Sequence, residues 1–340
     1  MPFITLPDPR FALLGRHDPA EEKACLWWSG SGIRTSLACT VLEADITWQG
    51  TVHSPWIGIT LDGAPVCRFP LTAGTRRYTL LSGMDGSVPH EIAVVRDSQP
   101  AQGSDAGPVV IESVSTDGEP AVPTERPLLI EFLGDSLTVG EGTLGPVSAN
   151  EWRMAWISVL SAFPSLVSER MNADMRVIAL GGWGASRSWD DRTENRIGRI
   201  YGQLCAPIPG GEVPADFPER QADAVVINLG TNDGSAILRK TSEERTGAED
   251  LLCRRAAKLM AEARSRNPRA RLLWAYGLCG KPMEPILKRA VETYLSDGGH
   301  DAAYLSLTPS SGLGSRSHPD RDSHRRAAEE IVKKLREMGV

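Results

Sequence analysis

Three short stretches of the sequence place small and polar residues directly after an apolar run. They read GDSL at 134–137, GGWG at 181–184 and GTND at 230–233, and a fourth apolar run is followed by a glycine- and serine-rich loop that carries His318. Acyl transfer requires a nucleophile, a base and hydrogen-bond donors for the oxyanion. These stretches supply all three kinds of group, so the sequence predicts an acyl-transfer site.

Each candidate residue has a distinct role in this hypothesis. Ser136 attacks the acyl carbon, and His318 accepts its proton and passes it to the leaving alcohol. The backbone N–H groups of Ser136 and Gly184 and the side-chain amide of Asn232 hold the negative charge that develops. A glycine at 184 is expected because a side chain there would obstruct the substrate carbonyl. Trp183, beside this donor, is a candidate for stacking on a sugar ring.

The elements that must position these residues are predicted to be parallel strands. The runs PLLIEFL, MRVIALGG, ADAVVINLG, ARLLWAYG and AAYLSLT are apolar throughout, as strands covered on both faces should be. Helix-like stretches alternate with them at 150–171, 248–266, 282–297 and 321–338. This βαβ alternation predicts a doubly wound α/β domain with its site at the carboxyl ends of the strands.

The first part of the chain has a different pattern. Short runs rich in β-branched and aromatic residues are separated by turn signals such as Asp62-Gly63 and Asp85-Gly86. A β-sandwich of about a hundred residues is expected there. The stretch 116–127 has the proline, glycine and charge content of a linker. The predicted organisation is a sandwich at 1–120, a linker at 121–127 and the α/β domain at 128–340.

The ordered blocks GDSLT, GGWGAS, GTND and SRSHP resemble those of the SGNH, or GDSL-type, hydrolase family. The resemblance implies a flavodoxin-like three-layer α/β domain and ester hydrolysis without a metal or organic cofactor. The sandwich with its LLGR, WWSGSGI and LDG motifs is similar to the jelly-roll-like domain of carbohydrate esterase family 2, whose members are two-domain deacetylases of plant polysaccharides. This second resemblance implies removal of a small acyl group, most often O-acetyl, from a carbohydrate.

One position departs from the SGNH pattern. The family usually has an aspartate three residues before the catalytic histidine, where this chain has Ser315. Asp320 and Asp322 follow His318 at the start of a predicted helix, which suits capping better. We therefore expect a Ser-His dyad. The second imidazole nitrogen would be held by a backbone carbonyl near Gly314 or Ser315, or by the Ser315 hydroxyl.

Other interpretations of the same residues make demands that the sequence meets less well. Ser136 could simply cap a helix. Glycines at 140, 142 and 145 satisfy GxGxxG, but GDSLTV separates them from the strand, and a dinucleotide fingerprint should open a helix directly. No serine lies in a GxSxG elbow. His324, six residues after His318, is the competing histidine and is expected to be structural.

Composition excludes several classes of function. A net charge of −6 and a pI near 5.6 argue against a nucleic-acid partner, and no run approaches the ~20 apolar residues of a membrane span. The six cysteines form no zinc-ligand cluster, so no metal is expected, and buried free thiols are favoured over disulfides. The N-terminus lacks a signal-peptide pattern, which predicts a cytoplasmic chain, or a secreted one if a signal precedes this sequence.

Three functions remain open. The favoured one is a serine esterase acting on a small-molecule or polysaccharide ester. The second is an esterase or thioesterase for a lipid or a secondary metabolite, and the third is a glycan-binding protein in which the sandwich is the working part and the hydrolase domain has decayed. The intact set of Ser136, Gly184, Asn232 and His318 favours an enzyme over the third function.

Overall fold

The computed structural model describes residues 3–101, 103, 107–216 and 220–340. The chain divides into two compact units. The first comprises 1–126, 153–155 and 203–218, and the second comprises 127–152, 156–202 and 219–340. The two short inserts of the first unit were not part of the predicted sandwich, because nothing in their composition marks them. Within the first unit, the indole of Trp28 donates to the carbonyl of Leu204 at 2.6 Å.

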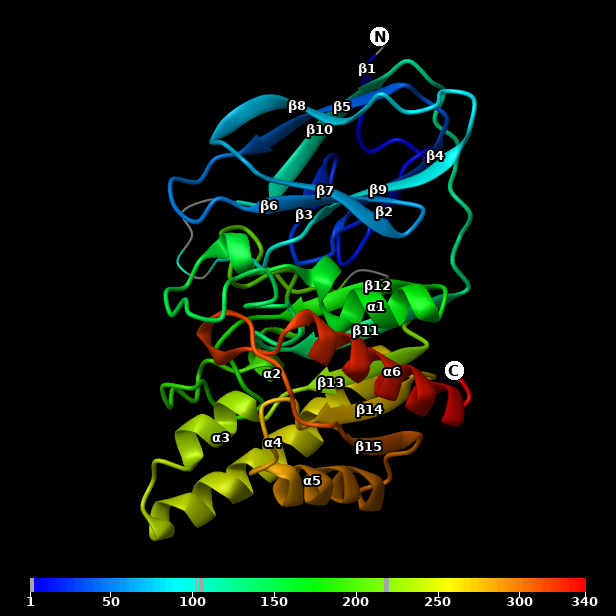
Figure 1. The fold of residues 1–340 in the computed structure, drawn as a ribbon. Coiled ribbons are helices and arrows are strands. Elements are labelled where there is room, and N and C mark those ends of the chain that lie inside the picture. The colour runs from blue at the N-terminus through cyan, green and yellow to red at the C-terminus, as the bar shows by residue number, and fades with distance from the viewer. Residues whose placement is uncertain (1–2, 102, 104–106, 217–219) are drawn as a thin grey trace. The chain divides into compact units, whose positions relative to one another are not determined.

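The first unit contains two antiparallel sheets (Figure 1). One has the order β1 (Phe3–Thr5), β10 (Val109–Thr116), β5 (Val41–Trp48) and β8 (Gly74–Ser82), with β3 (Ala24–Leu26) also paired to β10. The other has the order β2 (Ala12–Leu14), β4 (Gly32–Leu37), β9 (His90–Arg96), β6 (Trp56–Leu61) and β7 (Ala64–Pro70). Both sheets contribute to one hydrophobic core, and the predicted sandwich is confirmed.

The two Asp-Gly pairs behave differently. Asp62-Gly63 forms the tight turn between β6 and β7, with φ of 49° and 81°, as a two-residue hairpin requires. Asp85-Gly86 instead lies within the longer β8–β9 connection. There the Asp85 carboxylate accepts the N–H of Ser87 at 2.9 Å, so it stabilises the loop without closing a hairpin.

The second unit is built on a five-stranded parallel sheet with the order β12 (Ala173–Ala179), β11 (Leu128–Gly134), β13 (Ala224–Asn228), β14 (Arg271–Tyr276) and β15 (Ala302–Ser306). This order is the flavodoxin-like one. Every residue of β13 is buried, and since successive side chains point to opposite faces, both faces of the sheet are covered. The doubly wound α/β prediction is confirmed.

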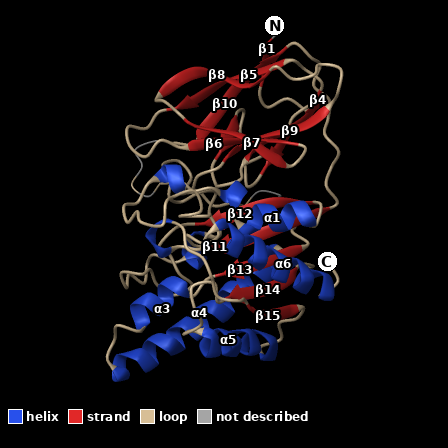
Figure 2. Cartoon of the chain, viewed as in Figure 1, coloured by secondary structure: helices blue, strands red, loops and turns tan. Residues whose placement is uncertain are grey.

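The helices of this unit are α1 (Phe163–Arg170), α2 (Ile197–Ile200), α3 (Thr231–Ile237), α4 (Ser242–Arg266), α5 (Glu284–Ser296) and α6 (Arg321–Glu337). Helix α1 packs against α6, and α4 packs against α5 (Figure 2). The stretch predicted as one helix over 150–171 contains only α1, preceded by the short 3₁₀ turns Met154–Trp156 and Val159–Ser161. Pro164, in the first turn of α1, explains why the α-helix begins so late.

None of the helices in the described part of the chain combines the length and the apolar character that a membrane span requires. All six cysteines are free thiols. The expectation that these thiols are buried holds for Cys39, Cys205 and Cys253, but Cys67 and Cys279 are exposed.

A buried carboxylate lies at the centre of the sheet. Glu131 of β11 is fully buried and forms an ion pair with Arg176 of β12. The Tyr201 hydroxyl donates to the same carboxylate, and the Asn267 amide donates to the Tyr201 oxygen at 3.2 Å. Burying a charge in this way is tolerable only while its partners remain.

Glu131→Gln should therefore destabilise the second unit by about 3 kcal/mol or more, because it leaves the buried Arg176 guanidinium without its counter-charge. Urea unfolding followed by circular dichroism measures this. Glu329→Gln is the control, since it removes an exposed carboxylate that pairs with Arg170 and should cost about 1 kcal/mol or less. Equal losses in the two variants would contradict this account of the network.

Candidate active site

Ser136 and His318 lie in hydrogen-bond contact. The distance between Ser136 Oγ and His318 Nε2 is 2.9 Å, although 182 positions separate the two residues in the sequence. Ser136 follows the end of β11, and His318 follows the 3₁₀ turn Ser315–Ser317. Both line a hollow of about 450 Å³, together with Glu141, Trp152, Gly181, Gly182, Trp189, Asn232, Ser235, Arg239 and Arg316. The two side chains thus meet in one open hollow, which is the arrangement that a nucleophile and its base require.

The turn that carries the serine is held by Asp135. This carboxylate is buried and accepts the N–H of Leu137 at 3.0 Å. Burial raises the pKa of Asp135 to about 7, an effect that the hydrogen bond to Leu137 partly opposes. Gly134 allows the tight turn, because a Cβ at that position would lie 1.8 Å from Thr138 Oγ1. Asp135 therefore orients the backbone around Ser136.

Asn232 is held at the edge of the hollow by two acceptors. Its Nδ2 lies 3.0 Å from Asp135 Oδ2 and 2.8 Å from the Trp183 carbonyl oxygen. These contacts link the loops after β11, β12 and β13 and fix the direction of the amide. Because both amide hydrogens have acceptors, a substrate oxyanion would have to share or replace one of them.

Asp233 fixes the loop that contains Gly184. Its buried carboxylate accepts the N–H groups of Ala185, Ser186 and Arg187 at 2.8, 2.7 and 3.1 Å. A Cβ at Gly184 would lie 2.2 Å from the Arg187 carbonyl oxygen and 2.4 Å from the Asp233 carboxylate. The structure thus gives a different reason for this glycine from the expected one: close packing within the loop demands it.

The second imidazole nitrogen of His318 contacts a backbone carbonyl. Nδ1 lies 3.0 Å from the carbonyl oxygen of Arg316, so neither Gly314 nor Ser315, the residues named from the sequence, makes this contact. The Ser315 hydroxyl instead packs at Gly145, where a Cβ would come within 2.3 Å of it. A backbone carbonyl near these residues was expected, and one does face the imidazole, but it belongs to Arg316. The sequence could not show how the backbone turns before the histidine.

That backbone is strained. Arg316 and Ser317 both adopt left-handed conformations, with φ of 55° and 57°, although neither is a glycine. Each such residue costs about 1 kcal/mol. The Arg316 N–H donates to the Ala149 carbonyl at 2.8 Å, which helps to hold the conformation. Strain of this kind is typical of segments that aim a group at a functional site.

The glycines of the apparent dinucleotide motif lie where other parts of the chain pack closely against the backbone, and Gly142 lies beside His318. A Cβ at Gly142 would lie 2.7 Å from the Cβ of His318, and a Cβ at Gly140 would lie 2.1 Å from the Ser158 carbonyl oxygen. Both glycines have positive φ. Protein atoms therefore occupy the space beside these glycines, and the chain does not offer them to a phosphate.

The tryptophan of the GGWG block does not line the hollow in the way the sequence suggested. The hollow is lined by Trp152 and Trp189, and Trp189 is 56% exposed. Trp189 sits over Gly182, where a Cβ would lie 3.0 Å from its ring, and its carbonyl accepts a hydrogen bond from Arg239. Four residues of the lining were not singled out from the sequence: Trp152, Trp189, Glu141 and Arg316. The first three lie in no quoted motif, and Arg316 lies in the SRSHP block without a signal that its side chain reaches the hollow.

His324 is a packing residue. It is fully buried in α6, its Nδ1 accepts the N–H of Phe163 at 3.3 Å, and its ring stacks on the Phe163 ring. Burial, together with the smaller effect of the nearby His318, lowers the pKa of His324 to about 4. Asp320 caps the same helix by accepting the Ser323 N–H at 2.9 Å, as expected from the sequence.

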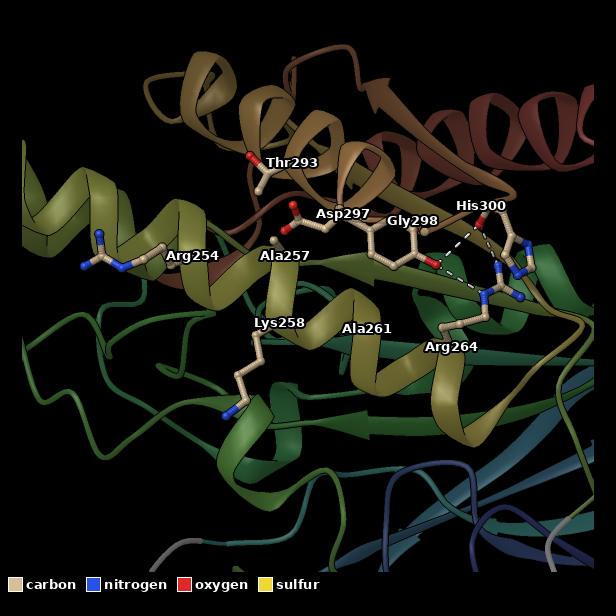
Figure 3. Close-up of a pocket in the computed structure, with 11 residues that line it drawn as sticks. Arg254, Ala257, Lys258, Ala261, Arg264, Thr293, Asp297, Gly298 and His300 are labelled. Carbon is tan, nitrogen blue, oxygen red and sulfur yellow. Dashed lines mark hydrogen bonds between the residues drawn. The ribbon is translucent and has the colours of Figure 1, made fainter.

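A second hollow, of about 470 Å³, lies between α4 and α5 (Figure 3). Arg264 is anchored there by hydrogen bonds to the Tyr294 hydroxyl and the His300 carbonyl. No serine or cysteine lines this hollow. Among the described residues, no group of three or more histidine, cysteine, aspartate or glutamate side chains is arranged to hold a metal ion.

A family model described as the GDSL-like lipase/acylhydrolase family matches residues 132–339. The chain belongs to this family. It is therefore a hydrolase of the GDSL type, which confirms the first of the two resemblances drawn from the sequence.

Similarity to carbohydrate esterases extends over nearly the whole chain. An acetylxylan esterase/glucomannan deacetylase of Cellvibrio japonicus is 23% identical over 342 residues, covering 98% of this chain and 90% of the relative. An acetyl xylan esterase of Butyrivibrio proteoclasticus superposes with a TM-score of 0.93 at 22% identity, over 99% of both chains. A family two carbohydrate esterase of Clostridium thermocellum, solved with cellohexaose, gives 0.83 at 23% identity, over 96% of this chain and 98% of that one. The family members thus share the fold of this chain.

The neutral state of His324 predicts a pH dependence of stability. Its pKa falls from 6.5 to about 4 on folding, so the unfolded chain binds more protons between these values. The stabilisation is complete above pH 6.5 and is lost as the pH falls toward 4, by about 3 kcal/mol in total.

His324→Phe removes this contribution. The stability difference between wild type and variant should change by about that amount between pH 7 and pH 4, as measured by urea unfolding. An unchanged difference would contradict a buried neutral histidine.

Proposed function

We propose that this chain is a serine esterase that removes a small acyl group, acetyl in particular, from a carbohydrate hydroxyl. The observation that carries the proposal is the 2.9 Å contact between Ser136 Oγ and His318 Nε2 inside an open hollow. The hollow supplies a nucleophile, a base and an amide donor to one substrate.

In this mechanism His318 takes the Ser136 proton as Oγ bonds to the acyl carbon. Asn232 and the backbone N–H groups of Ser136 and Gly184 stabilise the oxyanion that forms. The intermediate collapses when the bond between the acyl carbon and the sugar oxygen breaks and His318 gives its proton to that oxygen. The sugar leaves as an alcohol, and the acyl group remains on Ser136 as an ester. Water, deprotonated by His318, then attacks the carbonyl carbon of this ester. His318 returns the proton to Ser136 Oγ as the bond between Oγ and the acyl carbon breaks, and acetate is released.

The lining of the hollow supports a carbohydrate acceptor. The exposed Trp189 offers an aromatic face to a sugar ring, and Glu141, Arg239 and Arg316 offer polar contacts to hydroxyl groups. A long acyl chain would have to desolvate these charged groups at a cost, which disfavours a lipid ester. The names of the relatives, acetylxylan esterase and glucomannan deacetylase, point to the same substrate class.

Ser136→Ala should abolish hydrolysis of p-nitrophenyl acetate, and His318→Ala should cost nearly as much, because nucleophile and base act as one unit. His324→Ala is the matched control, since it removes a histidine of α6 that lies six positions after His318 and does not line the hollow. Its catalytic constant should stay within about threefold of wild type where the protein is folded. Activity retained by folded Ser136→Ala would overturn the proposal, as would polysaccharide binding by a chain that turns over no ester.

Trp189→Ala should separate sugar recognition from chemistry. We expect kcat/KM to fall about tenfold or more on acetylated xylo-oligosaccharides and to change little on p-nitrophenyl acetate, because only the sugar uses the aromatic face. Trp183→Phe is the control and should leave the ratio of the two values unchanged. A parallel loss on both substrates in Trp189→Ala would show that this tryptophan supports the site and does not bind sugar.

A further inference from the structure

The base of the proposed dyad lacks the carboxylate that usually accompanies it. Position 315 is a serine, and His318 Nδ1 faces the neutral carbonyl oxygen of Arg316 at 3.0 Å. A carbonyl fixes the tautomer and the ring orientation, but it carries only a partial negative charge. The imidazolium that forms when His318 takes a proton is better stabilised by a full negative charge nearby.

Glu141 places such a charge on the other side of the ring. Its Oε1 lies 4.0 Å from His318 Nε2, and its side chain is only 6% exposed, so water screens the interaction weakly. The backbone ties it to the nucleophile as well, since the Glu141 N–H donates to the Ser136 carbonyl at 2.9 Å. Glu141 is thus fixed relative to both members of the dyad.

Arg316 connects this carboxylate to the histidine. Its guanidinium forms an ion pair with Glu141, and its own carbonyl oxygen faces His318 Nδ1. Arg316 has a left-handed φ of 55°. Its ion pair with Glu141 and the hydrogen bond from its N–H to the Ala149 carbonyl both help to hold this conformation. One residue thereby holds the ring orientation through its main chain and the carboxylate through its side chain.

We propose that Glu141 and Arg316 together replace the missing third member of the triad. Glu141 stabilises the imidazolium of His318 through space, and Arg316 is a positioning residue that orients both the carboxylate and the imidazole. This inference rests on the proposed Ser-His mechanism and adds two residues to it: Glu141, which lies outside the quoted sequence blocks, and Arg316, which lies within the SRSHP block.

The other titratable groups near the base have fixed roles. His324 of α6 is buried and neutral above about pH 4, and the Asp320 carboxylate is engaged at the cap of α6. Asp135 lies under the Ser136 turn and is held by Leu137 and Asn232. Arg239 also lines the hollow, and its guanidinium donates to the Trp189 carbonyl. Among the described residues, Glu141 forms the ion contact with His318, and Arg316 forms the ion contact with Glu141.

Opposite charges predict opposite shifts in the kcat/KM profile. Glu141→Gln removes a negative charge and leaves the Arg316 guanidinium, so the imidazolium is less stable and the acidic limb should move to lower pH by roughly 0.5 to 1 unit. The kcat of Glu141→Gln on the pH-independent plateau of its profile should fall about tenfold. Arg316→Gln removes a positive charge, so its acidic limb should move to higher pH. In the double variant the limb should return to within about 0.3 unit of wild type, since the two residues interact directly.

Two further variants separate charge from structure. Glu141→Asp keeps the charge and should keep the acidic limb within about 0.3 unit of wild type. Glu292→Gln, on the exposed side of α5, should change neither limb nor plateau. Melting temperatures establish that each variant is folded.

The outcomes distinguish this inference from the proposed function. If Ser136→Ala is inactive while Glu141→Gln keeps the wild-type plateau and acidic limb, the inference fails and the esterase proposal stands. A plateau loss in Glu141→Gln without a shift, or shifts of the same sign in Glu141→Gln and Arg316→Gln, would also overturn it, because a purely structural role behaves in that way. Activity in Ser136→Ala would overturn both proposals.

Discussion

The parallel sheet is the constraint on which the site depends. The carboxyl ends of β11, β12 and β13 meet at one edge, so loops far apart in the sequence are brought together there. The contact between Ser136 and His318 joins the loop after the first of these strands to the segment that precedes α6. Ser136, Asn232 and His318 are common polar residues. They form one candidate site because the order of the strands brings the loops that carry them together.

Two buried carboxylates fix the conformations of the loops that meet at this edge of the sheet. Asp135 holds the serine turn and the Asn232 amide, and Asp233 holds the three backbone N–H groups that follow Gly184. Their burial is costly, and each is accompanied by hydrogen bonds that offset part of the cost. Both are fully buried, and neither lines the hollow. They fix the loops in which the proposed catalytic groups sit, and the strained turn at Arg316 does the same for the base.

The sequence predicted the features that follow from hydrophobic patterning and from the order of short motifs. Uniformly apolar runs such as that of β13 predicted the parallel sheet, and the residues after those runs predicted Ser136, Asn232 and His318 as neighbours. It failed where the outcome depends on tertiary contacts. The carbonyl that faces His318 belongs to Arg316, because two residues before the histidine turn left-handed. The aromatic residues that line the hollow are Trp152 and Trp189, which lie in loops without a motif. Glu141 pairs with Arg316, which lies 175 positions away in the sequence.

The central claim is that an acyl group passes through Ser136. The most direct measurement is rapid acid quenching of the protein during turnover of an acetyl ester, followed by mass spectrometry of the peptides. The account predicts an acetyl group on the peptide that contains Ser136, formed within one turnover and absent from Ser136→Ala. Turnover with no acylated peptide at any quench time, or with the acetyl group on another residue, would contradict it.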